Sequence, residues 1–220
     1  MFSNNFLSAI IAFTITTCAS GKSKLVKYEL YDLNKSGKLQ VFNRVLTSII
    51  DKDQKCVRFS ESEGDGVAWL EDVNFINGII ELDIKGKDVL QKSFVGIAFH
   101  GKDEKTLDAI YFRPFNFQSS DSVRRIHAVQ YVSHPDFPWD ILREKQNGKY
   151  EKAIISKPSP NKWFHAKIIV QYPHVSVYVN NSTEPCSSID KLNDRQNGKI
   201  GLWVGNNSGG DFANLVITNK

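Results

Sequence analysis

The sequence is poor in cysteine and lacks the residue spacings that hold zinc. It has three cysteines in 220 residues, with no C-x-x-C pair and no cysteine–histidine pattern of metal-site type. We therefore assign no metal ligands. Once an N-terminal leader is removed, Cys56 and Cys186 remain. Two alternatives stay open for them: a disulfide closing a very long loop in an oxidising compartment, or two buried free thiols.

Runs of charge of one sign are also missing. The 28 Lys and Arg and the 24 Asp and Glu leave a net charge of +4, and the longest basic cluster is the pair Arg124-Arg125. Binding to nucleic acid would require a basic stripe, so we expect no nucleic-acid partner. The hydrophobic content of 41% excludes a largely disordered chain, because that much apolar material can offset the entropy lost on folding.

Long apolar segments are absent except near the N-terminus. Residues 6–15 (FLSAIIAFTI) form a mostly apolar run of ten residues without charge, which is half of the about 20 that a spanning helix needs. The run is typical of the central part of a secretory signal, and Thr17 and Ala19 are small enough for a cleavage site before Ser20. We expect residues 1–20 to be a leader and the protein to be exported to the periplasm, the cell surface or the medium.

Cys18 gives the leader a second interpretation. A lipoprotein cysteine becomes an acylated N-terminus, which would be the protein's one attachment to a membrane. The preceding residues 15–17 (ITT) match the usual small-residue pattern poorly, and no Lys or Arg precedes the apolar run. Cleavage without an anchor and lipidation at Cys18 both stay open, and a buried N-terminal element is the alternative to export.

The rest of the chain has the pattern of short β-strands. β-Branched and aromatic residues recur in stretches separated by Gly, Asn, Asp or Lys, at a spacing that predicts an all-β, antiparallel sandwich of two sheets. Residues 188–195 are the only segment that we expect to be helical. Without a repeat or a linker, residues 21–220 are expected to form a single domain. The expected strands include residues 79–84, 94–99, 109–115, 126–132, 164–171, 175–179, 199–204 and 212–218.

Five segments carry a family resemblance: residues 77–84 (NGIIELDI), 163–170 (WFHAKIIV), 175–181 (VSVYVNN), 198–203 (GKIGLW) and 211–217 (DFANLVI). They resemble strands of the concanavalin A-like lectin and glucanase jelly rolls, nearest to the laminin-G-like and 3-keto-disaccharide hydrolase-type domains of exported bacterial proteins. The resemblance implies two curved antiparallel sheets with ligands on the concave face or at its rim.

A glucanase mechanism is not supported by these residues. Related jelly-roll glucanases carry E-x-D-x-x-E on one strand, and retaining hydrolysis needs two carboxylates about 5–5.5 Å apart. Here Glu81 and Asp83 share one strand face, but Gly86 stands where the third carboxylate would be. We expect Glu81 and Asp83 to be a solvated strand face, and we reject the laminarinase mechanism.

The segment between residues 100 and 140 is richest in side chains suited to a sugar. Sugars present apolar ring faces and many hydroxyl groups, so their sites combine aromatic planes with fixed donors and acceptors. Along the expected strand 126–132, Gln130 has the opposite parity to His127 and Tyr131, and it joins them only at a bulge or a strand end. The residues expected to bind a ligand are His100, Tyr111, Arg113, Gln130, Tyr131 and Trp139.

Three residues are candidate general bases: His127, His134 and Asp136. A 3-keto sugar has an acidified C–H, so a base together with the cation of Arg113 would cleave it by elimination. His134 and Asp136 lie in residues 133–140, which two prolines predict to be a rigid loop. Each candidate also has a structural interpretation, as a satisfied core histidine or a turn cap, and the aromatic residues, Trp203 above all, can instead fill the core.

No cofactor is implied by the sequence. Structural calcium is an alternative at Asp211 or at the acidic residues Glu61, Glu63 and Asp65, although acidic loop residues usually form turns. The preferred function is that of an exported or surface-attached domain that interacts with a carbohydrate and has no catalytic signature. The alternatives are a glycoside-cleaving enzyme of the 3-keto-disaccharide hydrolase type and a protein-binding, laminin-G-like domain.

Overall fold

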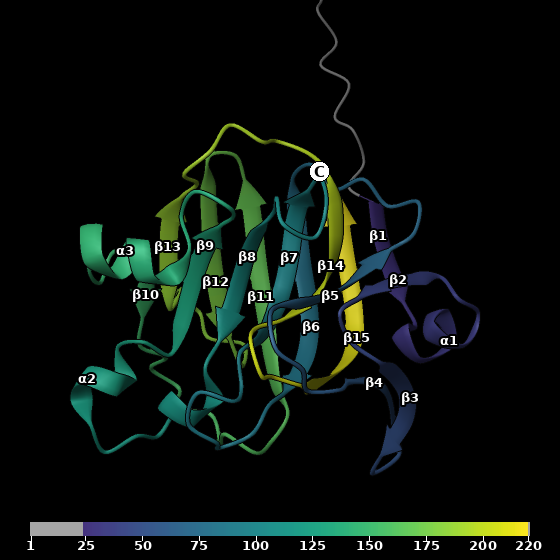
Figure 1. The fold of residues 1–220 in the computed structure, drawn as a ribbon, viewed down its shortest axis with the longest axis horizontal. Coiled ribbons are helices and arrows are strands. Elements are labelled where there is room, and N and C mark those ends of the chain that lie inside the picture. The colour runs from purple at the N-terminus through teal and green to yellow at the C-terminus, as the bar shows by residue number, and fades with distance from the viewer. Residues whose placement is uncertain (1–23, 220) are drawn as a thin grey trace, which may run out of the picture.

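The computed structural model describes residues 24–219, so the predicted leader, residues 1–20 with Cys18, lies outside it. The described residues form two antiparallel sheets, drawn one over the other in Figure 1. The first sheet has the order β13-β12-β11-β6-β15-β4-β3, with β1 also paired to β15. Its strands are β1 (Lys24–Tyr28), β3 (Leu46–Asp51), β4 (Gln54–Phe59), β6 (Gly78–Lys85), β11 (Phe164–Gln171), β12 (His174–Val179), β13 (Ser187–Asp190) and β15 (Gly210–Asn219).

The second sheet has the order β10-β9-β8-β7-β14-β5-β2. Every pairing within the two sheets is antiparallel, which confirms the all-β, two-sheet sandwich expected from the sequence. Its strands are β2 (Leu39–Phe42), β5 (Gly66–Leu70), β7 (Val95–Gly101), β8 (Asp108–Phe112), β9 (Val129–Ser133), β10 (Glu151–Lys152) and β14 (Lys199–Val204).

The core lies between the sheets and is built by alternation along the strands. On β6, Ile80, Leu82 and Ile84 are fully buried, while the residues between them face outward and are half-buried. Phe112 of the second sheet meets Phe164 of the first edge to face, with ring centroids 5.0 Å apart. Burial of apolar side chains from both sheets at this interface is the main stabilising contribution to the fold.

Short helices lie at the two ends of the sandwich. Helix α1 (Leu30–Lys35) packs against β3 and β4, whereas α2 (Ser122–Arg125) and α3 (Trp139–Lys145) lie at the opposite end, near β10 (Figure 1). Asp121 caps α2, since its carboxylate accepts the backbone N–H of Val123 at 2.8 Å. A 3₁₀ turn, η1 (Pro114–Asn116), follows β8. No helix among residues 24–219 has the length and apolar character needed to cross a bilayer.

Most expected strands are present, with three corrections. The predicted helix at residues 188–195 is wrong: Ser187–Asp190 form β13, whose alternating burial turns Ile189 inward. Strand β8 ends at Phe112 because Pro114 has no N–H to continue a ladder and instead begins η1. The strand predicted at 126–132 begins only at Val129, since the turn that ends α2 occupies the preceding residues.

Cys56 and Cys186 are both free thiols in the structure. Cys56 is buried on β4, and its sulfur donates to the carbonyl of Ile49, while Cys186 donates to the carbonyl of Val177 at 3.3 Å. Burial raises the pKa of Cys56 to about 11 and that of Cys186 to about 12. Of the two alternatives left open by the sequence, the structure has the free thiols.

Candidate functional site

A pocket of about 920 Å³ lies on the face of the second sheet that points away from the core. Tyr111 of β8, Val132 of β9 and Trp203 of β14 form its floor, because they alternate with residues that face the core. Its walls come from loops and from helices α2 and α3, and they consist of Asp65, Leu90, Gln91, Lys92, Phe94, Arg113, Phe115, Asn116, Arg124, His127, His134, Pro138, Trp139, Arg143, Gly205, Asn206 and Asn207.

The floor and one wall are aromatic. The rings of Tyr111 and Trp203 have centroids 5.1 Å apart, and Phe94 meets Tyr111 edge to face at 6.0 Å. Phe115 packs on the far side of Phe94 at 5.6 Å. Trp139, at the start of α3, is 49% exposed and presents its ring at the rim. Tyr111 and Trp203 are only 3% and 4% exposed, so they form the base of the pocket, and the ring open to a ligand is that of Trp139. An exposed aromatic plane is a surface of the kind on which a sugar ring stacks.

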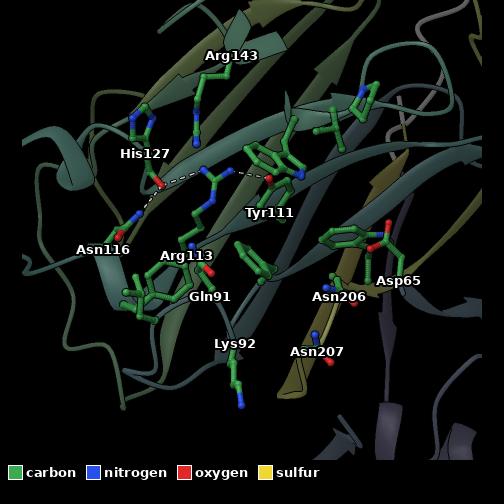
Figure 2. Close-up of a pocket in the computed structure, with 18 of the residues that line it drawn as sticks. Asp65, Gln91, Lys92, Tyr111, Arg113, Asn116, His127, Arg143, Asn206 and Asn207 are labelled. Carbon is green, nitrogen blue, oxygen red and sulfur yellow. Dashed lines mark hydrogen bonds between the residues drawn. The ribbon is translucent and has the colours of Figure 1, made fainter. Parts of the chain in front are cut away.

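Arg113 is buried beside this floor, and its donors are occupied by the protein. One terminal nitrogen donates to the carbonyl of His127 at 3.0 Å and to Glu151 Oε2 at 3.1 Å. The other donates to the Tyr111 hydroxyl at 2.8 Å and to the Oε1 of Gln130. Figure 2 shows Arg113 between His127 and Tyr111, with its guanidinium linked to both. The guanidinium therefore fixes the position of Tyr111 and of the chain at His127.

Glu151 is the carboxylate that holds Arg113 and Arg143 together beside the pocket. It is 3% exposed and accepts two hydrogen bonds from Arg143, at 2.9 and 2.7 Å, besides the one from Arg113. Burial by itself would raise the pKa of Glu151, but the Arg143 hydrogen bonds and the charge of Arg113 hold it below its ordinary value. Glu151 is therefore ionised at neutral pH.

His127 lies against the same carboxylate. Its Nδ1 is 2.9 Å from Glu151 Oε2, but the ring N–H is not aligned for a hydrogen bond to any acceptor. Desolvation lowers the pKa of His127, and this outweighs the attraction of Glu151. The imidazole is therefore neutral at pH 7 and half-buried at the wall of the pocket.

At the other end of the pocket, His134 faces Asp65, with 3.8 Å between Nε2 and Oδ2. Burial lowers the pKa of His134 and raises that of Asp65. Asp65 lies near Asn206 in Figure 2, away from His127 and Arg143. The pocket thus has an arginine-rich end and an end with amide and carboxylate groups.

Of the nine residues predicted to form a site, five line this pocket: Tyr111, Arg113, His127, His134 and Trp139. Four others do not. Asp136 is an exposed turn residue outside the lining. Gln130 lies below the floor, fully buried, and accepts from the Tyr111 hydroxyl at 2.9 Å. Gln130 is paired with Tyr111 across β8 and β9. Strand β9 begins at Val129, after His127, so His127 and Gln130 lie on either side of the strand end that the sequence analysis required for them to come together.

His100 and Tyr131 belong to a buried polar cluster away from the pocket. Lys191 lies 3.0 Å from Asp108 Oδ2 and 2.6 Å from His100 Nδ1, and Tyr131 donates its hydroxyl to Asp108. His100 and Tyr131 are fully buried. Their polar atoms satisfy one another inside the protein, so they do not contact a ligand in this pocket.

Several lining residues were not predicted. Arg124, Arg143, Lys92, Asn206 and Asn207 lie on loops and short helices, whose place around a pocket no local pattern indicates. Trp203 was expected in the core and is buried, at 4% exposed, but its side chain lies on the opposite face of β14 from Leu202 and Val204. Both faces of β14 are buried, so the alternation of side chains along the strand did not show which face points to the space between the sheets.

The E-x-D pair lies far from the pocket in the fold. Glu81 and Asp83 occupy the outward face of β6 in the first sheet, where His165 Nδ1 is 2.8 Å from Asp83 Oδ1. Asp211, one of the calcium candidates, receives two hydrogen bonds from Arg58, at 2.6 and 2.7 Å. In the part of the chain that the structure describes, no three His, Cys, Asp or Glu side chains gather as a metal site would require.

The pocket can bind a ring and position polar groups around it. Among its lining residues Asp65 is the one carboxylate, whereas two-carboxylate glycoside hydrolysis needs a flanking pair. The neutral imidazoles of His127 and His134 can accept protons. The arrangement is therefore suited to recognition, and the chemistry that it offers beyond recognition is base catalysis by histidine.

Comparison with known proteins places this fold. No protein-family model matches the sequence, and no curated protein matches it either. Solved structures do. A carbohydrate-binding module, CBM66, from Bacillus subtilis matches with a TM-score of 0.59 and 16% identity, over 82% of this chain and 95% of that one. The chain has a concanavalin A-like jelly-roll fold.

Two further structures agree with this fold. Domain 4 of AbnA, an extracellular arabinanase from Geobacillus stearothermophilus solved with arabinotriose, has a TM-score of 0.52 and 19% identity, over 90% of this chain and 94% of that one. A Bacillus licheniformis β-glucanase has a TM-score of 0.54 and 15% identity, over 91% of this chain and 99% of that one. The jelly-roll resemblance noted in the sequence is confirmed at the level of the fold.

Proposed function

We propose that the protein binds a carbohydrate in the pocket on the outer face of the second sheet. The observation that carries the proposal is the combination of an aromatic floor, formed by Tyr111 and Trp203, with the exposed ring of Trp139 at the rim. The exposed amide groups of Gln91, Asn206 and Asn207 line the same pocket and can pair with sugar hydroxyls.

The fold supports this proposal. Jelly rolls of similar structure include a carbohydrate-binding module and an arabinanase domain solved with arabinotriose. A single lining carboxylate, Asp65, favours binding over acid–nucleophile hydrolysis. We therefore propose a carbohydrate-binding domain, which fits the expected export of the protein, since polysaccharides are encountered outside the cell.

The test is titration of the purified protein with a panel of neutral and acidic glycans, with Trp139→Ala as the variant. Trp139 is half exposed, so its loss should change the free energy of unfolding by less than about 1 kcal/mol. Loss of one stacking plane should weaken binding by about tenfold or more. Trp163→Ala is the matched control, because Trp163 is bonded to Asp51 and lies outside the pocket. Absence of binding to every glycan, or unchanged binding by Trp139→Ala, would overturn the proposal.

Cleavage of a 3-keto glycoside is a second candidate, favoured by one observation. Burial lowers the pKa of both His127 and His134, which leaves two neutral bases at the wall of the pocket at pH 7. Incubation with 3-keto glycosides between about pH 5 and 8 tests this candidate. Product release that His127→Gln or His134→Gln abolishes would support it, and absence of product throughout that range would eliminate it.

Export is proposed from residues 1–20 alone. N-terminal sequencing of the protein recovered outside the cytoplasm tests it, with cleavage expected close to Ser20. An acylated N-terminus at Cys18 would support the lipoprotein alternative, and recovery of uncleaved protein only in the cytoplasm would contradict both.

A further inference from the structure

The arginine-rich end of the pocket holds more positive charge than the surrounding protein balances. Four cationic side chains line the pocket: Lys92, Arg113, Arg124 and Arg143. Among the lining residues and their ion-pair partners there are two carboxylates, Asp65 in the lining and Glu151 beneath it, which leaves an excess of two positive charges in this set.

The histidines do not offset this excess. His127 and His134 are held neutral at pH 7 by the lowered pKa that burial causes. The two imidazoles therefore neither add to the positive charge of the pocket nor balance it. For comparison, the whole chain of 220 residues has a net charge of only +4. A local excess of this size in one pocket is therefore a specific feature and does not follow from the composition.

The three guanidinium groups are linked through short hydrogen-bonded steps. Arg113 and Arg143 share Glu151. Arg113 and Asn116 both donate to the carbonyl of His127, at 3.0 and 3.1 Å, and Arg124 in turn donates to Asn116 Oδ1 at 3.3 Å. The protein thus assembles three arginines at one end of the pocket, where the carboxylate of Glu151 contacts Arg113 and Arg143.

Arg124 is the member of this cluster with no carboxylate partner among the described residues. Its guanidinium is held by neutral oxygens only, Asn116 Oδ1 and the carbonyl of Phe115 at 2.9 Å. It is half-buried, so part of its hydration is lost. An oriented, partly desolvated guanidinium without an anion is the arrangement that favours an anionic ligand, because its fork of donors matches a carboxylate or a sulfate.

We propose that the pocket selects acidic glycans, with the carboxylate or sulfate of the sugar bound at Arg124 and the ring stacked on Trp139. This inference rests on the proposed carbohydrate function and names its ligand class. A neutral sugar would leave the excess charge unpaired, whereas one anionic sugar unit placed at this end would compensate it.

The experiment compares matched polysaccharides that differ in charge. Binding to polygalacturonate and to its fully methyl-esterified form is measured by calorimetry, and agarose is compared with sulfated carrageenan in the same buffer. We expect the acidic member of at least one pair to bind at least tenfold tighter than its neutral partner. The first pair reports recognition of a carboxylate and the second recognition of a sulfate.

Arg124→Gln is the variant that tests the assigned residue. It should lose about tenfold in affinity for the acidic polymer, a larger loss than for the neutral one. Arg125→Gln is the matched control. Arg125 is the neighbouring residue of α2, donates to the carbonyls of Ser119 and Ser120, and does not line the pocket. Melting temperatures of both variants show whether the fold is intact.

The outcomes separate this inference from the function on which it rests. Equal binding to charged and neutral partners would overturn the acidic selectivity and leave the carbohydrate function standing. Absence of binding to all four polymers and to the wider glycan panel would overturn both. Polyglutamate, an anionic polymer without sugar rings, should not bind. If polyglutamate binds as tightly as polygalacturonate, or if Trp139→Ala binds polygalacturonate as tightly as the wild type does, the pocket attracts charge alone. Either result would also overturn the proposal.

Discussion

The rings of Tyr111 and Trp203 meet across an intervening strand, with centroids 5.1 Å apart. Tyr111 lies on β8 and Trp203 on β14, and β7 runs between them in the sheet. The residue of β7 in register with both is Gly96. Because Gly96 has no side chain, the two rings close over it and form one continuous aromatic floor.

Replacement of Gly96 by alanine should disrupt this floor. A Cβ at Gly96 would lie 2.1 Å from the carbonyl oxygen of Ile110 and 2.6 Å from the Cα of Tyr111, so the backbone of β8 would have to move. We expect Gly96→Ala to lower the free energy of unfolding by about 1–3 kcal/mol and to weaken glycan binding. Chemical denaturation measures the first effect. Ala98→Gly, a change on the same face of β7, should cost only about 1 kcal/mol. A Gly96→Ala variant as stable as the wild type would contradict this description of the floor.

The sequence predicts the sheets well because strand formation here follows local patterns. Residues 164–171 and 199–204 are strands with the predicted bounds, and Tyr111 and Arg113 fall near one another as alternation requires. The predicted helix at 188–195 fails because Ser187–Asp190 pair with β12 as a strand, and this pairing depends on a partner outside the segment. Local propensity carries no information about such partners.

The site is harder to predict from the sequence than the sheets are, because its residues also depend on partners that are remote in sequence. Five predicted residues line the pocket, but the residue that organises its cationic end is Glu151, which lies 38 positions after Arg113. It reaches the pocket because β10 pairs with β9. Density of polar and aromatic side chains indicated the right segment, whereas His100 and Tyr131 satisfied the same criterion and are buried in another cluster.

Glu151→Gln should destabilise the protein in a pH-dependent way. Without its charge, the guanidinium groups of Arg113 and Arg143 stay close together and unbalanced, so we expect a loss of about 3–5 kcal/mol at pH 7. The pKa of Glu151 in the folded protein is below its ordinary value. Its stabilisation is therefore complete above about pH 4.5 and is lost as the pH falls through the folded pKa.

Thermal melting of wild type and Glu151→Gln between pH 3 and 7 tests this account. The difference in melting temperature should be largest near pH 7 and should shrink at the acidic end. Glu144→Gln is the control, because Glu144 lies on the same helix as Arg143 and is exposed. A difference that stays constant with pH would mean that the charge of Glu151 is not what stabilises the pocket.

His165 should stabilise the fold at mildly acidic pH. Its hydrogen bond to Asp83 is the main cause that raises the pKa of His165, and Glu81 adds to it. A raised pKa means that the stabilisation is complete below about pH 6.5 and is lost as the pH rises through the folded pKa. Because the side chain is partly exposed, the effect should be at most about 1 kcal/mol.

The measurement is the change in unfolding free energy between pH 6 and 8.5, which should be smaller in His165→Gln than in the wild type. His174→Gln provides a comparison at an exposed ion pair, since His174 Nδ1 contacts Asp190 Oδ1 and the side chain of His174 is 68% exposed. An identical pH dependence in wild type and His165→Gln would show that the ion pair with Asp83 adds nothing to stability.

His100 should remain neutral over the whole range in which an ordinary histidine titrates. Burial, followed by the charge of Lys191, lowers the pKa of His100 to about 4. Nε2 lies 2.7 Å from the carbonyl oxygen of Ile76, and Nδ1 lies 2.6 Å from the Lys191 ammonium. The carbonyl can only accept and the ammonium can only donate, so the proton must be on Nε2 and Nδ1 must be the acceptor.

Nitrogen-detected NMR of the imidazoles should therefore find His100 as the neutral Nε2–H tautomer from pH 8 down to pH 5. Since the unfolded chain takes up this proton near pH 6.5, wild-type stability should decline as the pH falls from about 6.5 towards 4. Lys191→Met should leave His100 neutral at pH 7 but raise its pKa, because the repelling charge is gone while the burial persists. Titration of His100 near pH 6.5 in the wild type would contradict the buried cluster itself, and with it the reason why this histidine lies outside the binding pocket.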